Sequence, residues 1–362
     1  MAGFSGQLMT APSKALAIET LDYHTAGEPL RIITSGLPEI VGDSMLAKRR
    51  YMQQELDDYR KLLMREPRGH ADMYGAVLTD PVTDNGDTGV LFLHNGGYST
   101  MCGHAIIALV TAAVEQQVFP IKNPDRVRID TPAGQVVAKA HLDAEGNVLK
   151  VSFCNVPSFV LEPEFSVKVD GITVDMCIAF GGAFYAYIDA QKYGFELLPN
   201  EASELVAFGK KIKTAVATQY PIHHPAGDED LNFLYGCIFV KPGGKPGHSR
   251  NACVFADGQL DRSPTGTGVS GRAAIHWSRG ELVLGESLDI ESIIGTRFRV
   301  RCVEEVLIGG LRGIIPEVTG SASLTGKHCF VLDPRDLLPT GFQLNSAART
   351  QAAETLNKSE FP

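Results

Sequence analysis

A cysteine stands at the start of an apolar, helix-like stretch in the sequence GGYSTMCGHAIIAL. Unpaired N–H groups at a helix N-terminus bind carboxylates, and neighbouring glycines let the backbone approach closely. The positive end of the helix also favours thiolate, lowering a cysteine pKa from about 8.5 to about 3.5–7.5. Cys102 is therefore a candidate base or nucleophile, and the amides of Gly103 and His104 are candidate carboxylate ligands. The alternative, that Cys102 only fills a tight turn, stays open.

A second glycine-rich turn, DRSPTGTGVSGRAAI, has the same layout but carries Thr265 where the cysteine would stand. A threonine hydroxyl exchanges hydrogen bonds but is not a base near neutral pH. The amides of Gly266 and Thr267 could hold the same carboxylate from the other side, if both helices point at one cleft. Asp261 could bind a substrate ammonium group, although a helix cap or a pair with Arg262 fits its spacing nearly as well.

The other polar clusters favour structural roles. The seven cysteines are odd in number and none has CxxC spacing, which indicates neither a disulfide framework nor a zinc site. The stretches HTAGEPLR (24–31) and RGHADMYG (68–75) could line a cleft, but we expect their histidines and acids to form turns and ion pairs. The histidines at 223–224 precede an acidic run without helical i, i+4 spacing, so we expect no metal there.

The elements that must position these residues can be read from the apolar pattern. Four stretches are typical of helices: 44–66, 103–117, 200–217 and 267–280. Ser44 is a plausible cap for the first. The second is apolar on most of its circumference, which predicts a helix buried within a layer of strands. Short alternating runs separated by turn residues predict strands between the helices. The order strands, buried helix, strands occurs twice, which predicts two similar halves that divide near residues 181–182.

The bulk composition is that of a globular protein with two domains. The chain has 362 residues, of which 44% are hydrophobic and 21% charged. A formal net charge of −9 argues against a nucleic-acid or acidic-membrane surface. Neither a membrane-spanning run nor a secretory signal is apparent. We therefore expect a cytoplasmic enzyme with a small-molecule substrate and neither a nucleic-acid nor a membrane partner.

Four motifs, taken in order along nearly the whole chain, resemble the proline racemase family. They are HTAGEPLR, GGYSTMCGHA, AFGGAFYA (179–186) and DRSPTGTG. The resemblance implies an α+β fold of the diaminopimelate epimerase-like type, with two pseudo-symmetric domains. Each domain is a mixed β-sheet or barrel around a central helix, and the active site lies in the cleft between them. We place the first domain at 15–181 and the second at 182–345. Residues 346–362 form a tail, for which a return to the first domain is left open.

The same resemblance implies roles for the site residues. Racemases and hydroxyproline epimerases of the family use two cysteines, one on each face of the substrate Cα. Here the first position is Cys102, while the second is Thr265. The amides of Gly103, His104, Gly266 and Thr267 would bind the carboxylate, and Asp261 the ring nitrogen. No metal or organic cofactor is implied, and a homodimer is an open option.

A cysteine–threonine pair is the mark of the family's trans-3-hydroxy-L-proline dehydratases. In that substrate the Cα hydrogen and the hydroxyl lie on one face of the ring. One acid/base group, Cys102, could therefore remove the proton and then protonate the departing hydroxide in a syn elimination. The expected product is Δ1-pyrroline-2-carboxylate, formed by tautomerisation of the enamine.

Three other functions remain open from the sequence. One is a racemase or hydroxyproline 2-epimerase with an unusual partner for Cys102, and another is a non-catalytic amino-acid-binding protein. The third is a thiol hydrolase that pairs Cys102 with His104. We disfavour the hydrolase because i, i+2 placement at a helix start is not expected to aim the imidazole at the sulfur, and no third orienting group is marked.

Overall fold

Runs of strands are interrupted by a few helices in the computed structural model, which describes residues 16–226, 229–242 and 248–344. The α-helices in this part of the chain are α1 (Met45–Glu55), α2 (Asp57–Met64), α3 (Gly103–Gln116), α4 (Ala202–Gln219) and α5 (Gly266–Ser278). The strands are β1 (Leu16–Thr25), β2 (Glu28–Ser35), β3 (Tyr74–Thr79), β4 (Thr88–His94), β5 (Gly97–Ser99), β6 (Val127–Thr131), β7 (Gly134–Leu142), β8 (Val148–Cys154), β9 (Ser158–Val169), β10 (Ile172–Phe180), β11 (Phe184–Asp189), β12 (Leu234–Pro242), β13 (His248–Phe255), β14 (Gln259–Leu260), β15 (Ser287–Glu291), β16 (Arg297–Ile308), β17 (Leu311–Gly320) and β18 (Ala322–Leu332). The predicted α+β class is confirmed.

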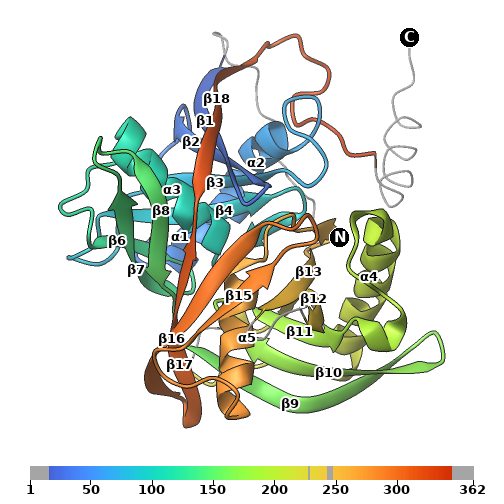
Figure 1. The fold of residues 1–362 in the computed structure, drawn as a ribbon. Coiled ribbons are helices and arrows are strands. Elements are labelled where there is room, and N and C mark those ends of the chain that lie inside the picture. Colours follow the sequence, from blue (N-terminus) through green and yellow to red (C-terminus); the bar gives the residue numbers. More distant parts are fainter. Residues whose placement is uncertain (1–15, 227–228, 243–247, 345–362) are drawn as a thin grey trace, which may run out of the picture.

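Helix α3 is the centre of one half of the molecule, which we call the α3 half. Its residues from Gly103 to Ala113 are all buried, as the apolar circumference predicted. It packs against β1, β2, β7, β8 and β18, which surround it in Figure 1. Helices α1 and α2 cover the outside of this half, against β4.

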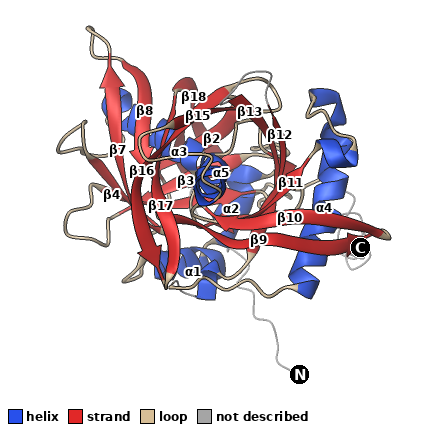
Figure 2. Cartoon of the chain, turned by 60° about the horizontal axis from the view of Figure 1, so that its bottom comes forward, coloured by secondary structure: helices blue, strands red, loops and turns tan. Residues whose placement is uncertain are grey.

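Helix α5 is the centre of the other half, the α5 half. It packs against β9, β10, β16 and β17, and in Figure 2 it lies at the middle of the strands. Helix α4 lies outside those strands, on β12 and β13. Both halves therefore have the predicted form, a helix enclosed by strands.

The predicted boundary between the two halves can be placed on the observed strand pairing. Residues 181–182 form the turn between β10 and β11, which pair with each other, so the predicted boundary falls inside a hairpin. Strand β18 pairs with β1 from Leu16↔Leu332 to Thr25↔Ala322, so the chain returns to the α3 half before residue 345. Pairing of β17 with β8 also links the halves. The division into two domains stays a prediction, and the tail at 346–362 lies outside the described residues.

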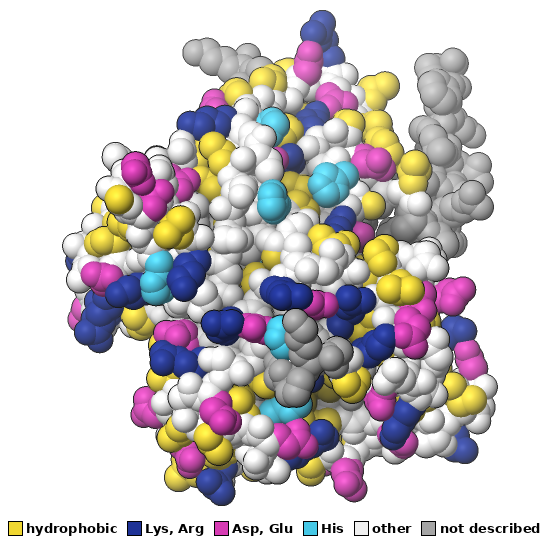
Figure 3. All heavy atoms as spheres, viewed as in Figure 1, with side chains coloured by type: hydrophobic (Ala, Val, Ile, Leu, Met, Phe, Trp, Pro, Cys, Tyr) yellow, Lys and Arg dark blue, Asp and Glu magenta, His cyan; other side chains and the backbone are white. Residues whose placement is uncertain are grey.

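Local signals explain how the first helical stretch is built. Ser44 is extended and its side chain accepts a hydrogen bond from the Ala47 N–H at 3.1 Å, which confirms the predicted N-cap. The predicted single helix is divided at Leu56 into α1 and α2. No helix of the described residues is long and apolar enough to cross a membrane. On the face shown in Figure 3, basic and acidic side chains are interspersed.

Candidate active site

The N-termini of α3 and α5 meet at their first residues, Gly103 and Gly266. A Cβ added to either glycine would lie 2.6 Å from the Cα of the other, closer than any real contact. Only glycine permits this approach of two backbones. The two glycine-rich turns singled out in the sequence are thereby brought to one place, with the positive ends of both helices directed at it.

The residues that precede these glycines are the N-caps of the two helices, and their backbones differ. Cys102 has an extended backbone, with φ −146° and ψ 109°. Thr265 has φ 68° and ψ 99°, a left-handed φ that is unfavourable for a β-branched residue. Such strain persists only where the surroundings hold it, and it concentrates at functional sites. The two turns are therefore alike in layout and different in backbone as well as in side chain.

The sulfur of Cys102 lies 3.1 Å from Nδ1 of His104. The expectation that i, i+2 spacing would not aim this imidazole at the sulfur is therefore wrong. The physical reason is the extended backbone of the N-cap, which differs from the helical backbone of the first turn that carries His104. Both side chains are buried, at 5% and 4% exposure.

Burial decides the protonation of this pair. Desolvation raises the pKa of Cys102 well above its usual range, more than the Ala105 N–H and the Tyr74 hydroxyl lower it. The expected low thiol pKa is therefore wrong for this closed arrangement. Desolvation also lowers the pKa of His104 to about 3. The imidazole is neutral and hydrogen-bonds the Pro29 backbone, so we assign Nδ1 as the acceptor of the thiol hydrogen.

Asp261 organises the turn that carries Thr265. Its Oδ1 accepts the Ser263 N–H at 2.7 Å, and its Oδ2 accepts the Thr265 hydroxyl at 2.7 Å. The Ser263 hydroxyl in turn accepts the Thr265 N–H. Burial raises the pKa of Asp261, and these hydrogen bonds partly offset that effect. Asp261 thus bonds within its own turn rather than pairing with Arg262.

A small cavity lies between the two turns, with a volume of about 20 Å³. That is about the room needed by one water molecule, so the two turns are closed on each other. It is lined by every residue of the predicted site and by aromatic and apolar neighbours: Cys102, Gly103, His104, Asp261, Thr265, Gly266, Thr267, Tyr74, Met101, Tyr185, Tyr235 and Phe255.

Three tyrosines of this lining were missed by the sequence reasoning. Tyr185 hydrogen-bonds the Thr267 hydroxyl at 2.8 Å, and Tyr74 hydrogen-bonds Ser99. The hydroxyl of Tyr235 is buried beside those of Tyr74 and Ser99. These side chains come from β3, β11 and β12, which are far apart in the sequence. Tyr185 lies in the AFGGAFYA motif and Tyr74 in the stretch 68–75, which could have located them, whereas no motif marks Tyr235.

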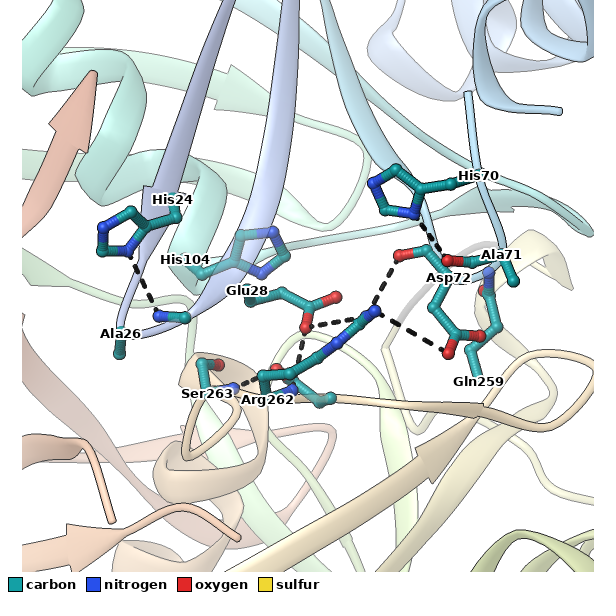
Figure 4. Close-up of polar contacts among 12 residues, drawn as sticks. His24, Ala26, Glu28, His70, Ala71, Asp72, His104, Gln259, Arg262 and Ser263 are labelled. Carbon is teal, nitrogen blue, oxygen red and sulfur yellow. Dashed lines mark hydrogen bonds and ion pairs between the residues drawn. The ribbon is translucent and has the colours of Figure 1, made fainter. Parts of the chain in front are cut away.

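The stretches 24–31 and 68–75 form turns and ion pairs beside the cavity, as predicted (Figure 4). Nδ1 of His24 accepts the Gly27 N–H. The carboxylate of Glu28 is fully buried and accepts the Arg262 N–H at 2.8 Å. The Arg262 guanidinium lies 3.4 Å from the same carboxylate and 3.9 Å from that of Asp72. Through these contacts, Arg262 in the turn before α5 binds two acidic residues of the α3 half.

The described residues contain no cluster of three or more histidine, cysteine, aspartate or glutamate side chains suited to a metal. His224 Nδ1 accepts the Ala226 N–H, and its ring packs on Phe180 and Phe159. Asp228, the first residue of the acidic run that follows, lies outside the described residues.

Comparisons with known proteins show which family the chain resembles. Residues 20–343 match the family described as Proline racemase. A trans-3-hydroxy-L-proline dehydratase from Colwellia psychrerythraea is 50% identical over 333 residues, covering 91% of this chain and 93% of that protein. A 3-hydroxyproline 2-epimerase from Burkholderia multivorans is 44% identical, covering 90% and 98%. The crystal structure of a hydroxyproline epimerase from Agrobacterium vitis with bound trans-4-hydroxy-L-proline has a TM-score of 0.85 at 28% identity, covering 91% and 96%.

Proposed function

The chain belongs to the proline racemase family, and from that premise we propose that it dehydrates trans-3-hydroxy-L-proline to Δ1-pyrroline-2-carboxylate and water. The name of the Colwellia relative supports this substrate. The observation that carries the proposal is the pair of facing N-caps, of which Cys102 has an ionisable thiol and Thr265 only an alcohol.

The reaction needs one acid/base group on one face of the ring. The thiolate of Cys102 removes the Cα proton, and the thiol so formed gives that proton to the hydroxyl at C3. The C3–O bond breaks with loss of water, and the electrons of the former Cα–H bond form the Cα–C3 double bond. The resulting enamine gains a proton at C3 and loses the one on nitrogen, which gives the pyrroline.

His104 has a second role in this scheme, beyond its backbone amide. Its neutral imidazole, 3.1 Å from the sulfur, accepts a hydrogen bond from the thiol and so positions the sulfur. The raised pKa of Cys102 leaves only a small thiolate fraction at neutral pH, and this reactive fraction grows as the pH rises.

The substrate carboxylate lies between the two helix ends. Backbone amides of Gly103 and His104 on one side and of Gly266 and Thr267 on the other stabilise the negative charge that develops when Cα loses its proton. Asp261 faces the ring nitrogen. Thr265 shapes the opposite face of the cavity and cannot return a proton to Cα, so inversion is not supported by this constellation.

The test is a product assay on the full chain with a panel of proline and hydroxyproline stereoisomers. o-Aminobenzaldehyde reports any pyrroline formed. The proposal requires that trans-3-hydroxy-L-proline gives pyrroline at a far higher rate than the other isomers. Inversion of proline or of a hydroxyproline at C2, without pyrroline formation, would contradict the dehydratase proposal and support a racemase or 2-epimerase.

A 2-epimerase of the same family is the second candidate. The observation in its favour is the 44% identity with the Burkholderia epimerase. It would require a second acid/base group opposite Cys102, and among the described lining residues Thr265 holds that position. Homodimerisation and a cytoplasmic location remain predictions from the sequence. Light scattering of the purified chain tests the first.

A further inference from the structure

The α5 half contains a second and much larger cavity, with a volume of about 980 Å³. It is bounded by β9 to β13 and β15 on one side and by the C-terminal part of α5 on the other. In Figure 1, α5 runs away from the interface between the halves toward these strands. The catalytic turns lie at the other end of the same helix, and none of their residues lines this cavity. A volume of this size is typical of ligand-binding pockets.

A buried arginine lies on the wall of this cavity. Arg272 of α5 is only 5% exposed, yet no salt bridge joins it to a carboxylate in the described part of the chain. Its guanidinium donates to the Ser249 hydroxyl at 2.6 Å and to Oδ1 of Asn251 at 2.9 Å, both neutral. Desolvation lowers its pKa to about 10, which still leaves it charged at neutral pH. Buried charges are normally paired, so this one lacks its usual counter-ion.

The third partner of Arg272 is His276, which helps to stabilise the buried guanidinium charge. Nε2 of His276 lies 2.9 Å from the guanidinium, and Nδ1 of the same ring lies 2.6 Å from the carboxylate of Glu281. The imidazole therefore donates from Nδ1 to Glu281 and accepts at Nε2 from Arg272. The negative charge of Glu281 is separated from the arginine by a whole ring, and its side chain is half exposed. It screens the buried cation without neutralising it.

The remaining walls mix apolar and polar side chains. The apolar side chains that face the cavity include Val240, Ile275 and Leu288. Carboxylates and cations both occur at its exposed rim, where Lys192 lies 3.7 Å from Asp175. The rim therefore selects neither sign of charge, and the buried charge is that of Arg272. A fitting ligand needs one anionic group for Arg272 and an apolar body for the walls.

We propose that this cavity is a binding site for an organic monocarboxylate, whose carboxylate pairs with Arg272 and whose apolar body packs against Val240, Ile275 and Leu288. A guanidinium binds a carboxylate through two parallel hydrogen bonds, which favours this anion over a point-like one. The site is separate from the proposed dehydratase chemistry, since it needs neither Cys102 nor the helix N-termini. Arg272 lies six positions after Gly266 in α5, which is about 9 Å along the helix axis.

The test is isothermal titration calorimetry of the full chain with four probes. Octanoate combines a carboxylate with an apolar tail, octylamine carries the opposite charge on the same tail, octan-1-ol carries none, and inorganic phosphate has no tail. We expect one octanoate per chain, bound at least about tenfold more tightly than each of the other three. Equal binding of octylamine or octanol would overturn the role of Arg272, and equal binding of phosphate would overturn the role of the apolar walls.

Two variants locate the bound octanoate. Arg272→Gln should weaken its binding at least about tenfold, while the matched control Arg301→Gln, on β16 and outside the cavity, should leave it unchanged. Val240→Trp fills the apolar wall and tests the site even if Arg272→Gln does not fold. It should remove octanoate binding and keep the turnover of the catalytic site. Wild-type octanoate affinity in folded Val240→Trp or Arg272→Gln would place the ligand elsewhere, including at the catalytic helix ends, and would overturn the proposal.

Discussion

The hydroxyl of Thr265 donates its hydrogen to Oδ2 of Asp261 at 2.7 Å, while the thiol of Cys102 faces Nδ1 of His104 at 3.1 Å. The two N-caps thus have partners of opposite kinds. Threonine is held as a donor to an acid, and cysteine is beside a neutral base. This difference favours one proton-transferring group in the cavity rather than two.

Thr265→Cys should restore a second thiol on the opposite face of the cavity. We expect some dehydration to remain, within about 10- to 100-fold of the original rate, together with slow epimerisation at C2. Chiral chromatography of the recovered amino acid, alongside the pyrroline assay, measures both. An inactive variant with intact fold and substrate binding would show that threonine does more than leave the second base position vacant.

Cys102→Ser should reduce pyrroline formation by at least about 10³-fold, because a serine hydroxyl does not ionise at neutral pH. Cys329→Ser is the matched control, since Cys329 is exposed on β18 and does not line the cavity. It should keep full turnover in the o-aminobenzaldehyde assay. Substantial turnover by the Cys102 variant would rule out the thiol as the base.

His104→Gln keeps the backbone amide but loses the basic ring nitrogen. We expect kcat to fall about 10²-fold with little change in KM, because carboxylate binding uses the amide and not the ring. Steady-state kinetics distinguish the two parameters, and circular dichroism checks the fold. An unchanged kcat would mean that the hydrogen bond to the imidazole does not position the sulfur.

The pH dependence of kcat/KM follows from the direction of the shifts. Burial raises the pKa of Cys102, and the reactive form is the thiolate, so kcat/KM should rise with pH from 6 to 9. The pKa of His104 near 3 keeps its imidazole neutral over this range, so it should add no inflection. Initial rates at low substrate concentration measure the profile. A fall between pH 6 and pH 8 would contradict a thiolate base.

The sequence was sufficient for features that depend on local pattern. The buried helix α3, the cap at Ser44 and the positions of Cys102 and Thr265 at helix starts all follow from residue types within one turn of chain. The convergence of both turns on one cleft was an expectation that followed from the family resemblance. The facing glycines, Gly103 and Gly266, show the physical basis of that prediction.

Other features depend on contacts that the local sequence does not encode. The cavity tyrosines come together only through the order of the strands. The pairing of β18 with β1 joins segments about 300 positions apart, and no short motif marks it. The raised pKa of Cys102 depends on burial from all sides, whereas the helix end alone predicts the opposite direction. Local reasoning also missed how an extended N-cap brings Cys102 to His104.

The most direct test of a single acid/base group is incubation of the wild-type enzyme with trans-3-hydroxy-L-proline in D₂O. Nuclear magnetic resonance then follows the product and the remaining substrate together. We expect pyrroline to form in step with substrate loss, while the remaining hydroxyproline keeps its configuration at C2. Accumulation of the C2 epimer with deuterium at Cα, without pyrroline, would show two groups acting on opposite faces and would contradict the account.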